Sequence, residues 1–110
     1  MPTNRTPTRI AGPAFVPDTP ATAYTVGASK ILVVRFVTVT CVSDPDGIAL
    51  GIGGVATDDL FLSIAASDLS AGLGGTFWTY EVLTAGETLQ WVAGVASTAS
   101  VSVNADLYDA

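Results

Sequence analysis

The chain has 110 residues, of which 49% are hydrophobic and 13% charged, and its formal net charge at pH 7 is −6. This length predicts a single domain with one modest core. The acidic balance argues against nucleic-acid binding, which needs clustered Lys or Arg, and against docking on an anionic membrane.

Residues 1–20 hold five of the six prolines of the chain. Prolines at this density exclude a helix or a central strand, so the segment is predicted to be an extended arm that precedes a domain over residues 21–110. Two basic and three apolar side chains of the arm are candidates for anchoring it, either on its own body or on a partner: Arg5, Arg9, Ile10, Phe15 and Val16. A disordered terminus is the alternative.

Charge is distributed unevenly along the chain. Residues 1–30 carry three basic residues against one carboxylate, a net charge of +2. Residues 31–110 carry one basic residue against nine carboxylates, a net charge of −8. A weakly basic arm on an acidic body suits an arm that lies on an acidic neighbour, whereas a solvated tail would need no such contrast.

The first part of the domain is predicted to contain four strands, at residues 21–26, 31–42, 48–53 and 60–64. The strongest signal is 31–42, ILVVRFVTVTCV, because branched and aromatic side chains follow one another without a turn residue. We expect this stretch to be a central strand. Residues 43–47, with Asp, Pro, Asp and Gly, predict a turn. In 48–53 one face is almost bare backbone, which allows close approach of another strand or subunit.

Three further strands are predicted at residues 76–83, 88–93 and 99–107, whereas residues 65–75 are interpreted as a loop. In the first of them Trp78, Tyr80 and Val82 share one face, and their alternation predicts that this face is turned to the core. Trp91 and Phe36 are predicted to join Trp78 there. The last strand alternates small apolar and polar residues, as in a strand with one wet face.

Seven or eight short strands without an amphipathic helix predict an all-β fold, a single antiparallel, jelly-roll-like β-sandwich with an N-terminal arm. The single cysteine, Cys41, lies within the long strand and is expected to be a small buried hydrophobe. Residues 1–10 do not have the pattern of a signal peptide, so we expect the protein to fold in a cytoplasm.

Catalytic chemistry has little support in this sequence. The absence of histidine removes the usual general base and most zinc sites. Glu81 and Glu87 resemble a glycosidase pair only in being two glutamates, and they flank a tight connection. Loop carboxylates at Asp44, Asp46, Asp58 and Asp59 suggest calcium, but their spacing matches no calcium loop. We therefore predict a non-enzymatic protein with no catalytic residues, no cofactor and no metal site.

The low charge of so small a domain predicts that other subunits cover part of its apolar surface, in a homo-oligomer such as a trimer. A small monomer with an alanine-rich surface is the alternative.

Three parts of the chain resemble small accessory virion proteins of tailed bacteriophages. Residues 23–26, Ala-Tyr-Thr-Val, lead through a Gly/Ala/Ser/Lys turn into the valine-rich strand, as a "YTVPAGK" opening does in that family. The aromatic strand around Trp78 and the stretch 83–89, Leu-Thr-Ala-Gly-Glu-Thr-Leu, continue the resemblance with an "L-x-A-G-E-x-L" hairpin. The resemblance spans residues 23–107. This chain departs from it at Gly27, where the family usually has proline, and in its longer proline-rich arm.

The resemblance implies a structural protein of a phage virion, assembled in the cytoplasm of the bacterial host. The first expectation is a capsid decoration or cementing protein that binds the major capsid protein through its arm, so that deletion of residues 1–20 leaves a folded domain without particle binding. A minor tail or tail-tip protein in contact with tail proteins or a host receptor is the alternative. A third interpretation, from the residues themselves, is a carbohydrate-binding module that stacks sugars on Trp78 and Tyr80.

Overall fold

The computed structural model describes residues 3–41, 47–65, 74–94 and 99–110. These ranges contain eight strands and one short 3-10 helix, joined by turns and short connections. The all-β prediction is therefore confirmed. The elements are β1 (Thr3–Phe15), β2 (Ala21–Thr25), β3 (Lys30–Cys41), β4 (Ile48–Ile52), η1 (Thr57–Asp59), β5 (Leu60–Ile64), β6 (Gly74–Thr84), β7 (Thr88–Ala93) and β8 (Ala99–Asp109).

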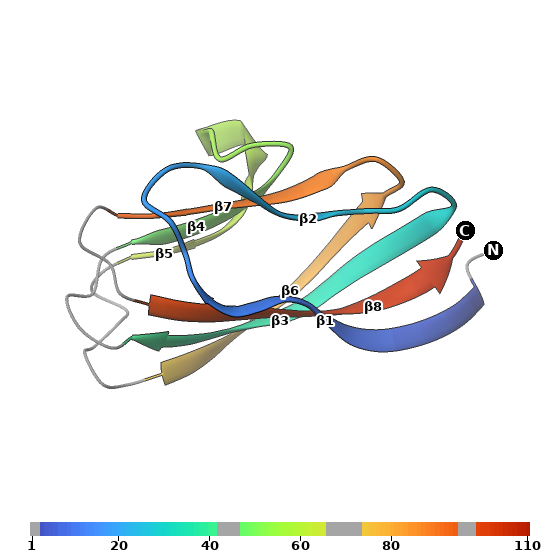
Figure 1. The fold of residues 1–110 in the computed structure, drawn as a ribbon, viewed down its shortest axis with the longest axis horizontal. Helices are drawn as coiled ribbons and strands as arrows, with labels where there is room; N and C mark the ends of the chain where they lie inside the picture. The colour runs from blue at the N-terminus through green and yellow to red at the C-terminus, as the bar shows by residue number, and fades with distance from the viewer. Residues whose placement is uncertain (1–2, 42–46, 66–73, 95–98) are drawn as a thin grey trace.

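The strands form two antiparallel four-stranded sheets. The first sheet has the order β1-β8-β3-β6 and the second has the order β2-β7-β4-β5. Figure 1 shows the two sheets stacked face to face, with the start of β1 and the end of β8 at the same end of the molecule. The predicted β-sandwich is therefore confirmed, and β3 is a central strand as expected, since it pairs with both β8 and β6.

The core lies between the sheets and consists of aliphatic side chains from alternate strand positions, together with one tryptophan. Trp91 is 7% exposed, in agreement with its predicted place in the core. Fully buried members come from both sheets and include Leu32, Val37, Leu50, Leu83, Leu89, Val101 and Val103. The period of two in β7 and β8 predicts these faces correctly, because each strand has one face on the core.

A bulge in β3 turns two neighbouring side chains to the outer face of the first sheet. The register of β3 shifts between Val34 and Phe36 against both neighbouring strands. Val34 and Val37 are both buried, so Arg35 and Phe36 between them are the pair that points outward. The prediction that Phe36 lies in the core is therefore wrong, because a regular alternation does not include the bulge. Such a bulge re-aims side chains without ending the strand, and it places a charge beside an aromatic ring on the outer face.

Strand β6 corrects one sequence prediction. Trp78 is 76% exposed and Tyr80 70%, so these rings lie on the outer face and not in the core. The inward parity is set by Leu83, which is fully buried near the end of the strand. With a period of two, Phe77 and Thr79 then face inward and the larger aromatics face out. The register shift between β3 and β6 lets β6 keep this orientation beside the bulge. The Thr79 hydroxyl, on the inward face, donates to the Val34 carbonyl at 3.2 Å.

The connection after β6 joins the two sheets and is not a hairpin within one sheet, because β6 belongs to the first sheet and β7 to the second. The Glu87 amide donates to the Thr84 carbonyl at 3.0 Å, which closes a four-residue turn. Gly86 has a φ of 85°, a value that favours glycine at the third position of such a turn. The Leu-Thr-Ala-Gly-Glu-Thr-Leu stretch therefore specifies a tight crossing between layers.

The bare face of β4 is covered by the chain itself. A Cβ on Gly51 would lie 2.1 Å from the Gly54 carbonyl oxygen and 3.0 Å from that of Asp59. The glycine is thus needed because residues 54–59, which include η1, fold back over β4. No other subunit is required to explain this glycine.

The first 20 residues contribute a strand to the sandwich. Strand β1 is extended, as predicted, and pairs with β8 at the edge of the first sheet. Val16 is 5% exposed and belongs to the core, and Ile10 is partly buried and packs against the core cluster. These two side chains anchor the segment on its own body, which is one of the two arrangements that the sequence left open.

Candidate functional site

The outer face of the first sheet carries a row of large exposed apolar side chains. Along β6, Trp78, Tyr80 and Val82 are 76%, 70% and 45% exposed. We call these three residues the β6 row. Strand β6 is also the edge of its sheet in the described part of the chain, since it pairs only with β3. An exposed apolar row on an edge strand is a common sign of a surface that is covered in the working state of a protein.

Two contacts hold the β6 row against β3. The rings of Phe36 and Trp78 lie 5.0 Å apart between centroids, with their planes inclined by 51°. The guanidinium carbon of Arg35 lies 5.7 Å from the centre of the Tyr80 ring, a cation–π distance. The bulge in β3 makes both contacts possible, because it brings Arg35 and Phe36 to the same face. The outer aromatics are therefore positioned by neighbours and are not loose surface side chains.

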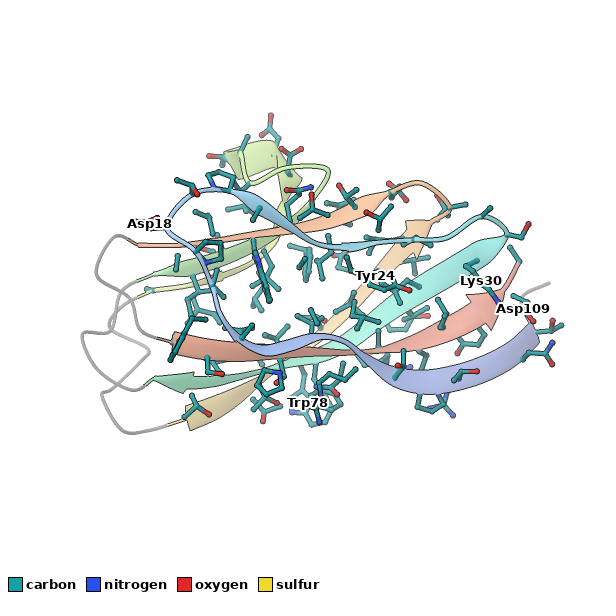
Figure 2. The ribbon with its side chains drawn as sticks, viewed as in Figure 1. Asp18, Tyr24, Lys30, Trp78 and Asp109 are labelled. Carbon is teal, nitrogen blue, oxygen red and sulfur yellow. The ribbon has the colours of Figure 1, made fainter. Side chains whose placement is uncertain are left out.

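Beside the row lies a hollow of about 460 Å³, lined by strands β1, β3, β6 and β8. Three of the four basic residues of the chain line it: Arg5, Arg9 and Arg35. Trp78 forms part of its wall, and Asp106 lies in it between the arginines. We call this feature the arginine hollow. Figure 2 shows Trp78 projecting from the outer side of the first sheet, away from the second sheet.

Asp106 organises the arginine hollow. One of its oxygens, Oδ2, lies 3.1 Å from Nε of Arg5 and 3.4 Å from Nη1 of Arg35. Its side chain is 4% exposed, although it belongs to the outward parity of β8, because the two arginines cover it. The hydrogen bond to Asp106 and the carboxylate charge raise the pKa of Arg5. The carboxylate thus links β1, β8 and β3 across the outer face.

Both guanidinium groups keep donors for another partner. The Arg5 and Arg35 side chains remain 58% and 47% exposed, and both contact the same carboxylate oxygen. Each guanidinium has five N–H donors in a planar fork, which suits carboxylates and other planar anions. Arg9 makes no ion pair among the described residues. The hollow has three positive charges against one negative, so it is locally basic in an acidic protein.

The five residues predicted to anchor the arm fall into two groups. Ile10 and Val16 pack on the protein's own core, whereas Arg5, Arg9 and Phe15 stay accessible. Phe15 is 64% exposed at the end of β1. That these accessible residues bind a partner stays a prediction. The two arginines belong to the arginine hollow, so the arm and the β6 row form one continuous surface.

A second charged group closes the end of the sheet where the termini meet. Lys30 forms an ion pair with Asp109, and the Asn4 side-chain amide donates to the same carboxylate at 2.8 Å. The hydrogen bond from Lys30, followed by that from Asn4, lowers the pKa of Asp109. Figure 2 shows Lys30 and Asp109 together at this end of the molecule. These contacts connect β1, β3 and β8, and they leave Lys30 outside the hollow.

The residues considered for calcium or catalysis are not brought into one site by the described structure. Asp58 and Asp59 lie in η1, whereas Asp44 and Asp46 lie outside the described residues. Within the described ranges, no group of three or more metal-ligating side chains occurs. The Glu87 carboxylate accepts from the Thr84 amide at 2.7 Å and from its hydroxyl at 2.9 Å, a structural use in the turn.

No described helix is long and apolar enough to cross a membrane.

Sequence reasoning missed the arginine hollow because its members are far apart in the chain. Arg5 and Asp106, for example, meet only through the pairing of β1 with β8. One signal was available: Arg35 and Asp106 are charged residues in the interior of strands whose only other charge lies at one end, Lys30 in β3 and Asp109 in β8. A charge in a strand interior commonly requires a partner on the neighbouring strand.

Comparisons with known proteins add a likeness in fold. No family model matches the chain, and no curated protein matches it. Among solved structures, the chain is similar to one from a study of Bacillus endospore appendages, described as a novel family of disulfide-linked pili. The TM-score is 0.53 and the identity 12%, over 99% of this chain and 90% of that one. At this identity the likeness concerns the fold alone.

Proposed function

We propose that this chain is a structural protein that associates with copies of itself, and that it belongs to a bacteriophage virion as an accessory capsid protein of decoration or cementing type. The observation that carries the proposal is the exposed β6 row beside the arginine hollow. Tryptophan, tyrosine and arginine are the residues that contribute most to protein–protein interfaces. This face concentrates Trp78, Tyr80 and three arginines.

The size of this face supports the proposal. The sheets are stacked in the view of Figure 1, so the outer face runs along the longest and shortest axes of the molecule, 43 and 18 Å. These extents correspond to roughly 800 Å², which is about the area that one partner buries in a standard interface. A contact of standard size would therefore cover most of this face.

Two further observations support a structural role. The sequence resemblance to accessory virion proteins covers residues 23–107, the sandwich without β1, and the similar fold in the appendage chain belongs to a protein described as forming pili. In the virion, the accessible arm residue Phe15, which lies outside the arginine hollow, would contact the major capsid protein. A bridge between neighbouring capsid subunits favours the assembled shell, since it binds only that state. A minor tail protein with the same fold is the variant of this proposal.

Self-association is tested by the mass of the purified full-length protein in light scattering over a range of concentrations. We expect a mass above that of one chain, and a lower mass for the double variant Trp78→Ser/Tyr80→Ser. Thr76→Ser is the matched control, because Thr76 is also exposed on the outer parity of β6. A double variant with the mass and concentration dependence of the wild type would contradict the assigned surface.

The location in a virion requires a separate test. An antibody raised against the chain is applied to phage particles purified from the bacterial host, and gold labelling is examined by electron microscopy. Labelling over the capsid supports the decoration role, and labelling restricted to the tail supports the tail variant. Particles that contain no such chain would rule out both.

A second candidate, carbohydrate binding, gains support from the exposure of Trp78 and Tyr80. Exposed rings beside polar side chains can stack on sugar faces, and Arg35 and Asp106 supply hydrogen-bonding groups next to them. A glycan array discriminates this candidate. Binding of a defined glycan that is lost in Trp78→Ala would favour it over self-association.

A further inference from the structure

The basic residues of this protein are confined to one of its two sheets. Arg5 and Arg9 lie in β1, and Lys30 and Arg35 lie in β3, both of which are strands of the first sheet. These four are all the lysines and arginines of the chain. Because Lys30 is paired with Asp109 at the end of the sheet, the other three define the charge of the outer face. With Asp106 included, the arginine hollow has a net charge of +2.

The other side of the sandwich is acidic. Asp58 and Asp59 lie in η1, and Asp18 lies in the connection from β1 to β2. Figure 1 shows η1 on the outer side of the second sheet, away from the first sheet. Asp18 and Asp58 are exposed and Asp59 is half-buried, and none of the three makes an ion pair among the described residues. The molecule therefore has a basic, aromatic face and an acidic face on opposite sides.

This charge separation decides between two ways in which two copies can meet. A twofold contact would place the arginine hollow of one copy against that of another, so that two surfaces with a net charge of +2 each would face one another. A head-to-tail contact places the arginines on the carboxylates of the next copy. Opposite charges are attracted and like charges across an interface are penalised, so the head-to-tail contact is favoured. The guanidinium donors left free by Asp106 can then bind the carboxylates of η1.

We propose that the protein self-associates head to tail, with the arginine hollow and β6 row of one copy docked on the η1 side of a second copy. The proposal rests on the proposed self-association and adds the identity of the two surfaces. A contact of this kind is heterologous, so it forms a closed ring or an open filament and not a simple twofold dimer. Trp78 and Tyr80 supply the apolar area, and the arginines select the orientation.

The experiment is a charge swap in the full-length protein, read as association constants from light scattering at low and high salt. Arg9→Glu is chosen because Arg9 has no ion pair among the described residues to lose, and Asp58→Lys because Asp58 is exposed. Each variant alone should weaken association by at least roughly two- to fivefold, the effect of removing one exposed ion pair. The variant with both changes should regain association, since the two introduced charges are again opposite across the contact.

The control and the salt dependence sharpen this test. Ala85→Lys adds a positive charge in the exposed turn between β6 and β7 without removing a side-chain hydrogen bond, and it should leave association unchanged. Association of the wild type should weaken as salt rises from about 0.05 to 0.5 M, because the Debye length shortens. Mixing the two single variants should also restore association, since their altered faces are complementary.

Each alternative outcome has a distinct meaning. If the wild type associates and both single variants associate equally well, the head-to-tail contact is wrong and self-association stands. If Arg9→Glu strengthens association and Asp58→Lys has no effect, the arginine faces meet each other and the proposal is overturned. If Arg9→Glu alone weakens association, the acidic partner is not η1. A wild type that is monomeric at every concentration would overturn this proposal and the proposed self-association together.

Discussion

Substitution of the two tryptophans of the chain should change stability by very different amounts. Trp91 is 7% exposed between the sheets, whereas Trp78 is 76% exposed on the outer face. A tryptophan side chain offers up to roughly 250 Å² of surface. Folding therefore hides about 230 Å² of Trp91 but only about 60 Å² of Trp78. The substitution of each by alanine should separate a core role from a surface role.

The expected magnitudes follow from these areas. At about 25 cal/mol per Å², burial of Trp91 contributes up to roughly 6 kcal/mol and burial of Trp78 up to roughly 1.5 kcal/mol. Both figures are upper bounds, because alanine keeps part of the area and the unfolded chain is not fully extended. We expect Trp91→Ala to cost about 3–5 kcal/mol, the usual range for a buried aromatic, and Trp78→Ala about 1 kcal/mol or less.

The assay is chemical denaturation followed by far-ultraviolet circular dichroism, which does not depend on the tryptophan that is removed. Measurements at a concentration where the wild type is monomeric remove any contribution from association. A domain of this size has a total stability of roughly 5–15 kcal/mol, so Trp91→Ala should lower the denaturation midpoint strongly. Equal losses for the two variants would refute the assignment of Trp78 to the outer face.

Three further substitutions test other parts of the structure. Glu87→Gln should remove part of the acid sensitivity of folding. Hydrogen bonds from Thr84 lower the pKa of Glu87 in the folded state. The stability that the charge of Glu87 provides is therefore present above the unfolded pKa, about 4.3, and is lost as the pH falls through the lower, folded value. Thermal melts from pH 7 to pH 3 measure this, and identical pH profiles would contradict it. Gly51→Ala should cost about 1–3 kcal/mol in denaturant titrations, because its Cβ would meet the Gly54 carbonyl at 2.1 Å. Gly27→Ala is the control, since only one side-chain atom lies within 4 Å there, and equal stability of the two variants would disprove the close approach. Asp106→Ala should cost about 1–3 kcal/mol by the same titration, because the arginines lose their common acceptor, and Asp106→Asn should cost less. An Asp106→Ala variant as stable as the wild type would show that the carboxylate does not link the strands.

Strand positions could be predicted from the sequence because their signals are local. The predicted strands at residues 60–64 and 88–93 agree with β5 and β7 at both ends, and the alternation in β8 identifies its buried face. Branched residues, period two and turn residues all act within a few positions along the chain. The class of fold follows from the number of such strands and the lack of helical periodicity.

The orientation of β6 could not be predicted from alternation alone, because both of its faces contain aromatic residues. The sequence interpretation chose the face with more apolar side chains, whereas Leu83 and the pairing with β3 determine the actual face. The bulge near Arg35 is likewise invisible to a rule that assumes regular alternation. An error of one position in parity moves every side chain of a strand to the other face.

The role of residues 1–20 depends on pairing across most of the chain length. Proline content correctly predicts an extended, non-central segment, but the antiparallel pairing with β8 joins Thr3 to Asp109. Removal of this segment would uncover the edge of β8 and take Val16 and Ile10 from the core. We therefore expect a truncated protein to lose stability, in contrast to the folded domain that the sequence interpretation expected. A truncated protein with an unchanged melting temperature would support the dispensable arm.

The most direct test of the central claim is whether Trp78 becomes inaccessible as the protein associates. In the conservative variant Trp91→Phe, Trp78 is the single remaining tryptophan, and its fluorescence can be quenched by acrylamide at increasing protein concentration. The proposed interface predicts strong quenching in dilute solution, where Trp78 is 76% exposed, and progressive protection as the light-scattering mass rises. A rise in mass with unchanged quenching would show that the copies meet elsewhere, and constant mass with constant quenching would contradict self-association itself.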